Sequence, residues 1–211
     1  MRERVEAAGR RFARLATRAV VAHPSLWRIF RGPLRRQFGS LASSWESRIG
    51  PEGLLPLGAA LDRLTASPRK ALDLGTGSGK AARVVAQRFP EAEVVGVDLA
   101  PEMVEEAKRL RPGNLGGRVD FQVADGAELP FADGEFDLVV LKNMIPFFDE
   151  LGRVTAPGGQ AIFAFSRGAQ TPIWVPPETL RARLERVGFG DFQELAAGSG
   201  TALLAAREDP G

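Results

Sequence analysis

The stretch that decides the fold runs from Ala71 to Lys80 and reads Ala-Leu-Asp-Leu-Gly-Thr-Gly-Ser-Gly-Lys. It begins as a short apolar segment, passes through the alternating glycines Gly75, Gly77 and Gly79, and continues into a segment with helical spacing. Glycine adopts left-handed backbone conformations easily and has no side chain to occupy the space of a ligand. A strand that passes into a helix through such a loop is typical of nucleotide-binding α/β proteins.

Two familiar glycine-loop motifs do not match this stretch. A dinucleotide-binding fingerprint that starts at Gly75 needs a glycine where this chain has Lys80. A phosphate-binding P-loop needs glycine at the position of Leu74 and serine or threonine at the position of Ala81. The P-loop is therefore excluded, and the dinucleotide-binding interpretation is weakened.

Segments with strand and helix character alternate after the loop. The pattern predicts strands over residues 70–74, 93–97, 118–124, 136–141 and 160–166, helices over 79–88 and 101–110, and a turn at 156–159. This alternation indicates parallel βαβ units with right-handed crossovers. The end of the chain predicts a helix over 177–187 and then a hairpin of strands 191–196 and 201–207, so the last strand should run antiparallel.

The first 67 residues predict a helical extension in front of an α/β domain at residues 68–208, in a chain with a single domain overall. Apolar residues recur at three- and four-residue spacing from Arg2 to about Ala22, which predicts an amphipathic helix that Pro24 interrupts. Further helices are expected over residues 25–37 and 54–64.

This extension is strongly basic. Eleven arginines and three glutamates between Met1 and Ile49 give a net charge of +8, and because the whole chain carries +2, the remainder carries −6. One interpretation is a docking surface for RNA or anionic lipid. The alternative is a solvated face on helices that pack against their own domain. The early glutamates oppose a transit peptide.

Composition excludes several kinds of chemistry. The chain has 211 residues, 44% of them hydrophobic, which is enough for one sizeable core. It has no cysteine and a single histidine, His23, so disulfides, thiolate nucleophiles and metal sites built on thiolates or clustered histidines are not expected. No apolar window is long enough for a spanning helix and the first residues are charged, so we expect a cytoplasmic protein.

Three acidic residues lie at or just beyond the ends of the first three expected strands: Asp73, Asp98 and Asp125. The carboxyl ends of parallel strands meet at one edge of the sheet, where nucleotide ligands bind. A carboxylate after the second strand can accept both hydroxyls of a ribose, and one after the third can accept a hydrogen bond from an exocyclic amine. The alternative is that these acids cap helices or form turns.

With these motifs the chain resembles the class I S-adenosylmethionine-dependent methyltransferases. The resemblance covers residues 70–207 and rests on the Ala71 stretch and on four further segments: Val94-Val95-Gly96-Val97-Asp98-Leu99 with Pro101-Glu102-Met103-Val104, Asp125-Gly126-Ala127-Glu128-Leu129-Pro130-Phe131, Phe136-Asp137-Leu138-Val139-Val140, and Ala156-Pro157-Gly158-Gly159. It implies a Rossmann-like three-layer α/β sandwich around a seven-stranded, mostly parallel sheet of order 3-2-1-4-5-7-6 with strand seven antiparallel.

The resemblance also implies the cofactor, S-adenosyl-L-methionine, its product S-adenosyl-L-homocysteine, and the residues that bind it. It gives the methionine end to Asp73 and the loop from Gly75 through Thr76 and Gly77 to Gly79, the ribose to Asp98, and the adenine face to Leu99. The adenine edge would be read by Asp125 with the backbone of Gly126 and Ala127, and Met103 and Leu141 complete the expected set. The segment from Phe38 to Trp45 is similar to a lid that some members fold over the cofactor, in which Trp45 would line the site. Core packing is the alternative for this tryptophan.

The chain differs from the family pattern after the fourth expected strand. Leu141 to Phe148 contains no histidine and no Asn-Pro-Pro-aromatic motif, and one short expected helix leads directly to Gly158. The candidate catalytic residues are Lys142 and Asn143, which would orient an acceptor at the end of the strand. Lys142 could act as a base if burial lowered its pKa, and the alternative is a surface lysine. Apolar acceptor contacts are expected from Phe147, Phe148, Ile173 and Trp174, which favours a small hydrophobic acceptor.

Two other functions stay open at this point. A noncatalytic member of the same fold could use its basic extension to bind RNA or a membrane, because a fold does not fix an activity. A nicotinamide-dependent oxidoreductase would share the crevice, but the incomplete fingerprint and the absence of tyrosine leave it without the usual acids.

Overall fold

The computed structural model describes residues 2–48 and 50–209, with side chains from residue 7 onward. Some residues that the sequence analysis used for charge and apolar spacing lie outside this description. They are Met1, Ile49 and the side chains of Arg2, Glu3, Arg4, Val5 and Glu6. The described part contains seven strands in one sheet of order β3-β2-β1-β4-β5-β7-β6. They are β1 Lys70–Leu74, β2 Glu93–Asp98, β3 Val119–Val123, β4 Phe136–Lys142, β5 Thr155–Phe165, β6 Phe189–Ala197 and β7 Gly200–Arg207.

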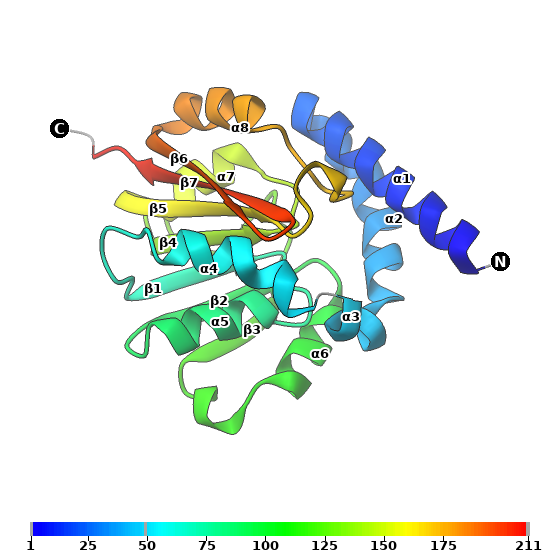
Figure 1. Cartoon of the computed structure of the whole chain (residues 1–211), viewed down its shortest axis with the longest axis horizontal. Helices are drawn as coiled ribbons and strands as arrows, with labels where there is room; N and C mark the ends of the chain where they lie inside the picture. Colours follow the sequence, from blue (N-terminus) through cyan, green and yellow to red (C-terminus); the bar gives the residue numbers. More distant parts are fainter. Residues whose placement is uncertain (1, 49, 210–211) are drawn as a thin grey trace.

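All neighbouring strands are parallel except β7, which runs antiparallel to both β5 and β6. The expected strand order and the antiparallel last strand are therefore confirmed (Figure 1). The helices are α1 Arg2–Ala22, α2 Trp27–Gly39, α3 Ala42–Arg48, α4 Leu55–Leu61, α5 Lys80–Arg88, α6 Pro101–Leu110, α7 Phe148–Val154 and α8 Pro177–Leu184. Short 3₁₀ turns at Pro24–Leu26, Pro51–Leu54 and Glu185–Val187 extend or precede three of them.

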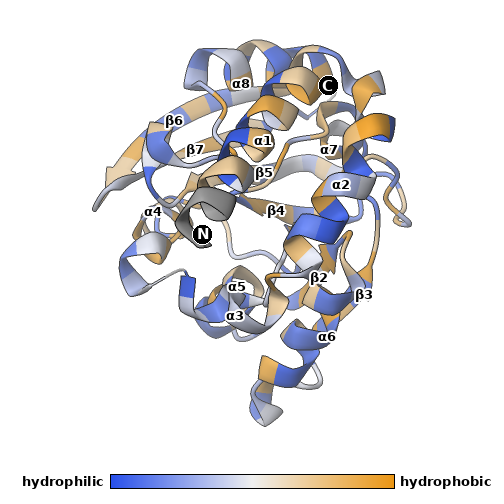
Figure 2. Cartoon of the chain, turned by 90° about the vertical axis from the view of Figure 1, so that its right-hand side faces the viewer, coloured by the Kyte–Doolittle hydropathy of each residue, from blue (hydrophilic) through white to orange (hydrophobic). Residues whose placement is uncertain are grey.

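Side chains alternate between the two faces of the sheet along its central strands, and helices cover both faces, so both are buried. On β4, Leu138 and Val140 pack in one core with residues of α4, α5 and α6, whereas Val139 and Leu141 pack in another with α7 and α8. Figure 2 shows hydrophobic colours along much of the central strands, and alternating hydrophobic and hydrophilic residues along the helices around them. The result is the expected three-layer sandwich.

The expected turn at residues 156–159 is wrong in one respect, because these residues already belong to β5. Thr155 pairs with Phe136, and a bulge follows before regular pairing resumes at Leu138 and Gln160. Gly158 provides the bend with a φ of 71°. The glycines therefore re-aim a strand that has already begun, which is a usual role of a bulge.

The N-terminal helices divide between two places. α4, which sequence grouped with the extension, packs through Leu57 and Ala60 into the same core as Leu204 of β7. α1 and α2 instead form an antiparallel pair: Gln37 Nε2 donates to the Gly9 carbonyl at 3.1 Å, and the rings of Phe12 and Phe30 lie 5.9 Å apart. In the described part of the chain, no helix is both long enough and apolar enough to cross a membrane.

The α1–α2 pair covers the edge of the sheet where the strands end. Its buried residues Ala16, Val20 and Leu34 share a core with Ile145, which follows β4, and with Ile173, which follows β5. The extension is therefore held over the carboxyl ends of the parallel strands, the place where ligands bind in such sheets.

Candidate functional site

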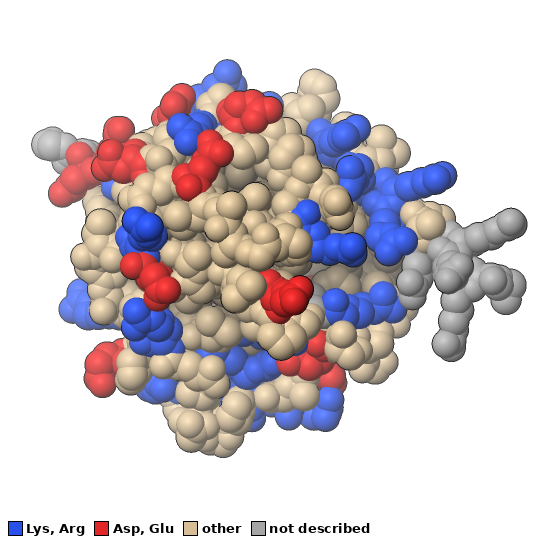
Figure 3. Space-filling view, viewed as in Figure 1, with Lys and Arg blue, Asp and Glu red and all other residues tan. Residues whose placement is uncertain are grey.

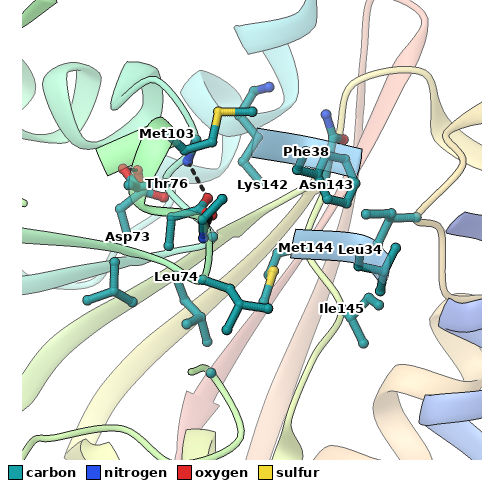
Figure 4. A pocket seen from close by; sticks show the side chains of 18 of the residues that line it. Leu34, Phe38, Asp73, Leu74, Thr76, Met103, Lys142, Asn143, Met144 and Ile145 are labelled. Atoms are coloured by element: carbon teal, nitrogen blue, oxygen red, sulfur yellow. Dashed lines mark hydrogen bonds between the residues drawn. The ribbon is translucent and has the colours of Figure 1, made fainter. Parts of the chain in front are cut away.

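A pocket opens at the carboxyl ends of β1, β2 and β4, beneath α2 and α3. It encloses about 950 Å³, including the space at its open mouth. The glycine loop and Asp73 form one side, and apolar side chains from α2 and from the segment after β4 form the other (Figure 4). The candidate residues that line it are Trp45, Asp73, Gly75, Thr76, Gly77, Asp98, Leu99, Met103, Gly126, Lys142 and Asn143. Sequence alone therefore predicted most of one wall.

The three glycines of the loop have left-handed backbones, with φ of 75° at Gly75, 55° at Gly77 and 79° at Gly79. A Cβ atom at Gly75 would lie 2.5 Å from Met144 Sδ, and one at Gly77 would lie 2.6 Å from Trp45 Nε1. Because these two glycines have no side chain, Met144 and Trp45 can lie directly against the loop. Gly79, also expected at the site, does not line the pocket; a Cβ atom there would lie 2.6 Å from Phe121 Cζ, so this glycine lets α5 pack on β3.

Asp73 is the buried acid of the site. Its Oδ2 accepts hydrogen bonds from Thr76 Oγ1 at 2.6 Å and from the Ala82 N–H at 2.9 Å. Its Oδ1 has no hydrogen-bond partner within the described residues. Burial raises the pKa of Asp73 to about 6, against the lowering effects of Thr76, Ala82 and the Lys142 charge. A carboxylate oxygen in this position fits a ligand that brings its own cationic hydrogen-bond donor.

Asp98 stands at the end of β2 as expected. Its Oδ2 accepts from the Gly77 N–H and its Oδ1 from the Ala100 N–H, both at 2.9 Å. Each carboxylate oxygen has two lone pairs, so each keeps one acceptor position for a ligand hydroxyl. Burial raises the pKa of Asp98, and the backbone hydrogen bonds oppose this rise.

Asp125, also expected at the site, does not line the pocket with the other two acids. Its Oδ1 accepts from Trp27 Nε1 at 2.7 Å and from the Ala127 N–H at 3.0 Å, and its Oδ2 lies 3.6 Å from Arg31 Nη1. Two side chains of α2, Trp27 and Arg31, therefore contact this carboxylate. Gly126 lines the pocket beside it, whereas Ala127 is exposed.

Lys142 and Asn143 meet at one hydroxyl at the end of β4. Lys142 Nζ and Asn143 Nδ2 each donate to Ser166 Oγ at 3.0 Å, and Ser166 Oγ donates to the Gly53 carbonyl at 3.0 Å. Ser166 N–H donates back to Asn143 Oδ1 at 3.0 Å. Asn143 holds a left-handed φ of 53°, a strained conformation of the kind that gathers at functional sites. Next to this pair Leu141, also expected to bind cofactor, is buried in the core and does not line the pocket.

Lys142 as a whole residue is only 8% exposed, so the surface-lysine interpretation is wrong. Burial lowers the pKa of Lys142 to about 8, although the Asp73 carboxylate opposes this shift. At neutral pH roughly a tenth of such amines are neutral, and the rest carry a proton. Ser166 takes one N–H of Lys142, which leaves further proton positions at Nζ for a molecule in the pocket.

α3 closes the pocket on its outer side through a contact that sequence did not reveal. Glu46 accepts from Ser78 Oγ at 2.6 Å and from Arg83 Nη2 at 2.8 Å, and its Oε1 lies 3.3 Å from Lys80 Nζ. Burial raises the pKa of Glu46, but the Ser78 hydrogen bond and the charges of Arg83 and Lys80 outweigh burial and lower it overall. Trp45, on the same helix, lines the pocket and packs edge-on against Phe38, with the two ring centroids 5.5 Å apart.

The acceptor contacts expected from sequence need revision. Of the four residues proposed, Ile173 lines the pocket, whereas Phe147, Phe148 and Trp174 pack in the hydrophobic cores. The apolar wall comes instead mainly from Phe38, at the start of the expected lid segment, and from four residues that sequence reasoning did not assign to the site: Trp27, Leu34, Met144 and Ile145. The spacing of Trp27, Leu34 and Phe38 along one face of α2 was the available signal, since an apolar face on a helix must cover something.

These residues fit the cofactor that the resemblance implies. The partnerless Oδ1 of Asp73 suits the ammonium group of its amino-acid end, and the free acceptor positions of Asp98 suit ribose hydroxyls. Leu99 and Met103 provide an apolar surface for a base. The pocket therefore presents both the carboxylates and the apolar surface that such a nucleoside would need.

Comparison with known proteins supports this assignment. Residues 71–159 match the family model described as a methyltransferase domain. A demethylmenaquinone methyltransferase of Thermus thermophilus is 42% identical over 106 residues, which is 47% of this chain and 48% of that protein. The chloroplastic tocopherol O-methyltransferase of Arabidopsis thaliana is 38% identical over 102 residues, 44% of this chain and 29% of that one.

The fold is likewise shared with solved structures. A SAM-dependent methyltransferase from Aquifex aeolicus superposes with a TM-score of 0.63 at 18% identity, covering 78% of this chain and 97% of that one. The chain spans half or less of the length of the curated relatives described above.

Proposed function

We propose that this chain is a class I S-adenosylmethionine-dependent methyltransferase, and that it transfers the methyl group to an apolar small molecule that carries an acidic hydroxyl such as a phenol. The observation that carries the proposal is the buried Lys142, which lines the pocket beside Asn143 in a cavity whose other side is formed by apolar side chains. The relatives named for demethylmenaquinone and tocopherol support an acceptor that is a small molecule.

The cofactor would supply a methyl group that its sulfonium has already activated for displacement. Asp73 would hold the cationic end and Asp98 the ribose. The protein's remaining task is to bring an acceptor oxygen into line and keep water out, and such positioning is worth roughly 7 to 11 kcal/mol of a barrier. Leu34, Ile145 and Ile173 give the acceptor an apolar environment.

The pKa of Lys142 selects the kind of hydroxyl. A neutral Lys142 amine with a pKa of about 8 can take the proton of a phenol, whose pKa lies near 10, at a cost of about 3 kcal/mol. An aliphatic hydroxyl with a pKa near that of water, about 16, would cost about 11 kcal/mol. The proton moves to Nζ, where Ser166 Oγ holds the amine in place. We therefore infer that aliphatic alcohols are poor acceptors.

We further propose that α1 to α3 act as the cap over this site and that the rest of the chain acts as the cofactor-binding domain. This adjusts the division expected between residues 67 and 68, because α4 packs with the sheet. The Glu46 contacts with Ser78 and Arg83 support a cap that closes directly on the glycine loop.

A methyl-transfer assay with labelled cofactor tests the proposal. The acceptor panel would contain apolar phenols, aliphatic alcohols of similar size, and RNA. We expect transfer to apolar phenols, a large loss of kcat in Lys142→Met with cofactor binding retained, and wild-type rates in Lys108→Met, whose lysine is exposed. Transfer to RNA with none to any phenol, or a fully active Lys142→Met variant, would overturn it.

A further inference from the structure

The α1–α2 pair carries an unusually one-sided charge. From residue 10 to residue 45 the chain contains eight arginines and no aspartate or glutamate. Two of them are used within the fold: Arg14 donates to the Thr171 carbonyl at 3.4 Å, and Arg31 faces Asp125. The other six are exposed: Arg10, Arg11, Arg18, Arg28, Arg35 and Arg36. Figure 3 shows these basic side chains gathered over the part of the molecule where Figure 1 places α1 and α2.

Exposed aliphatic side chains lie among these arginines. Leu15 of α1 is 61% exposed and Ile29 of α2 is 66% exposed, the two highest values for large hydrophobic residues in the described part of the chain. On α1, the sequence Arg11, Leu15, Arg18 follows helical spacing, so the three share one outward face. A helix face that mixes arginine with bulky aliphatic residues is typical of segments that lie on a membrane surface.

The aromatic residues of the same helices argue against a nucleic-acid partner. Proteins that hold single-stranded nucleic acid stack bases on exposed aromatic rings. Here Trp27 is buried and bonded to Asp125, and Phe12 and Phe30 pack against each other between the helices. Phe38 packs on Trp45 beneath them. The outer face therefore offers charge and aliphatic surface, but no stacking platform among the described residues.

The same helix connects this face with the pocket. Leu34 and Phe38 on the inner side of α2 line the pocket wall, and Arg35, between them in sequence, also borders it. A bilayer that contacted the outer face would thus lie next to the entrance of an apolar acceptor site.

We propose that the outer face of α1 and α2 docks the protein on an anionic phospholipid bilayer, from which the apolar acceptor enters the pocket. The docking surface comprises the six exposed arginines with Leu15 and Ile29. The acceptor route rests on the proposed function, whereas the docking itself does not depend on it.

Co-sedimentation with vesicles tests the docking. One set of vesicles is pure phosphatidylcholine and the other an equimolar mixture of phosphatidylcholine and phosphatidylglycerol. We expect binding to the anionic vesicles only, and loss of that binding at high salt, because screening weakens surface attraction. Each arginine near an anionic surface contributes about 1 kcal/mol, so a variant with Arg11→Gln, Arg18→Gln and Arg36→Gln should bind roughly a hundredfold more weakly.

Two matched variants separate specific docking from general charge. Arg63→Gln, Arg69→Gln and Arg186→Gln together remove the same charge from exposed positions elsewhere and should leave binding unchanged. Leu15→Ser with Ile29→Ser should weaken vesicle binding without changing the net charge. Circular dichroism checks that each variant is folded.

Several results would overturn the proposal: equal binding to both vesicles, equal loss in the two arginine variants, or full binding by the serine variant. Tighter binding to a single-stranded RNA than to anionic vesicles would also overturn it and would favour the nucleic-acid alternative. Methyl transfer to a detergent-dispersed phenol is measured separately. A protein that transfers methyl groups but ignores vesicles refutes the docking alone, and one that binds vesicles but transfers nothing refutes the proposed function alone.

Discussion

Replacing Asp73 by asparagine should make the protein more stable and its cofactor site weaker. The asparagine carbonyl can accept the hydrogen bonds of Thr76 and Ala82, and its amide group would take the place of the Oδ1 atom that has no partner. The shape of the site is kept while its charge is removed. Functional sites often hold such a group at the expense of stability.

The size of the effect follows from the pKa of Asp73, which rises from 3.8 to about 6 on folding. At about 1.36 kcal/mol per pKa unit, this is a destabilisation of about 3 kcal/mol when the carboxyl is ionised in both states. The folded state binds the proton more tightly than the unfolded state. The stability that the protonated carboxyl contributes is therefore fully present below about pH 4, and it is lost as the pH rises to about 6. Asparagine has no carboxyl group to ionise, so Asp73→Asn does not lose this stability.

Thermal unfolding at pH 5 and pH 7, without cofactor, measures the gain. For a chain of this size 1 kcal/mol shifts Tm by about 2 to 4 °C, so Asp73→Asn should raise Tm at pH 7 by several degrees and by less at pH 5. Asp120→Asn, at an exposed position on β3, is the control and should show no such pH dependence. Calorimetric titration should show cofactor binding weakened roughly 10- to 100-fold by the loss of a charge-assisted hydrogen bond. An Asp73→Asn protein that is no more stable at pH 7, or that binds S-adenosylmethionine as tightly as wild type, would refute the reasoning.

Three further predictions concern the other polar residues of the site. Asp98→Ala should weaken cofactor binding by one or two orders of magnitude in the same titration, and unchanged binding would remove Asp98 from the ribose site. The rate of methyl transfer should rise with pH through about 8 as Lys142 loses its proton, and Lys142→Met should abolish this rise in a pH–rate profile. Glu46→Gln removes the charge that faces Lys80 and Arg83, so stopped-flow measurements should show faster release of cofactor; an unchanged release rate would mean that α3 does not retain the ligand.

The sheet and half of the site could be predicted because their signals are local. The glycine loop between β1 and α5, together with Asp98 at the end of β2, fixes its own geometry over short stretches of sequence. Strand order followed from the resemblance, and the hairpin of β6 and β7 gave the antiparallel end independently. Asp73 could be assigned to the site for the same reason, since it lies next to the last residue of the strand that leads into the loop.

The remainder depends on contacts between distant parts of the chain. Asp125 was expected to face a ligand, but its partner Trp27 lies 98 positions earlier on a helix whose docking no local pattern specifies. Glu46 meets Ser78 and Arg83 for the same reason. The position of Lys142 at the end of a strand could be foreseen, whereas the burial that lowers its pKa depends on distant packing, so the sequence left a buried base and a surface lysine as alternatives.

The account stands on the claim that this pocket holds S-adenosylmethionine, and calorimetric titration of the purified chain tests it most directly. We predict saturable binding of S-adenosylmethionine and S-adenosylhomocysteine at one site per chain, weakened in Asp98→Ala, with no binding of NADH. Binding of NADH without any binding of S-adenosylmethionine would contradict the account and would favour the dinucleotide-binding interpretation of the glycine loop.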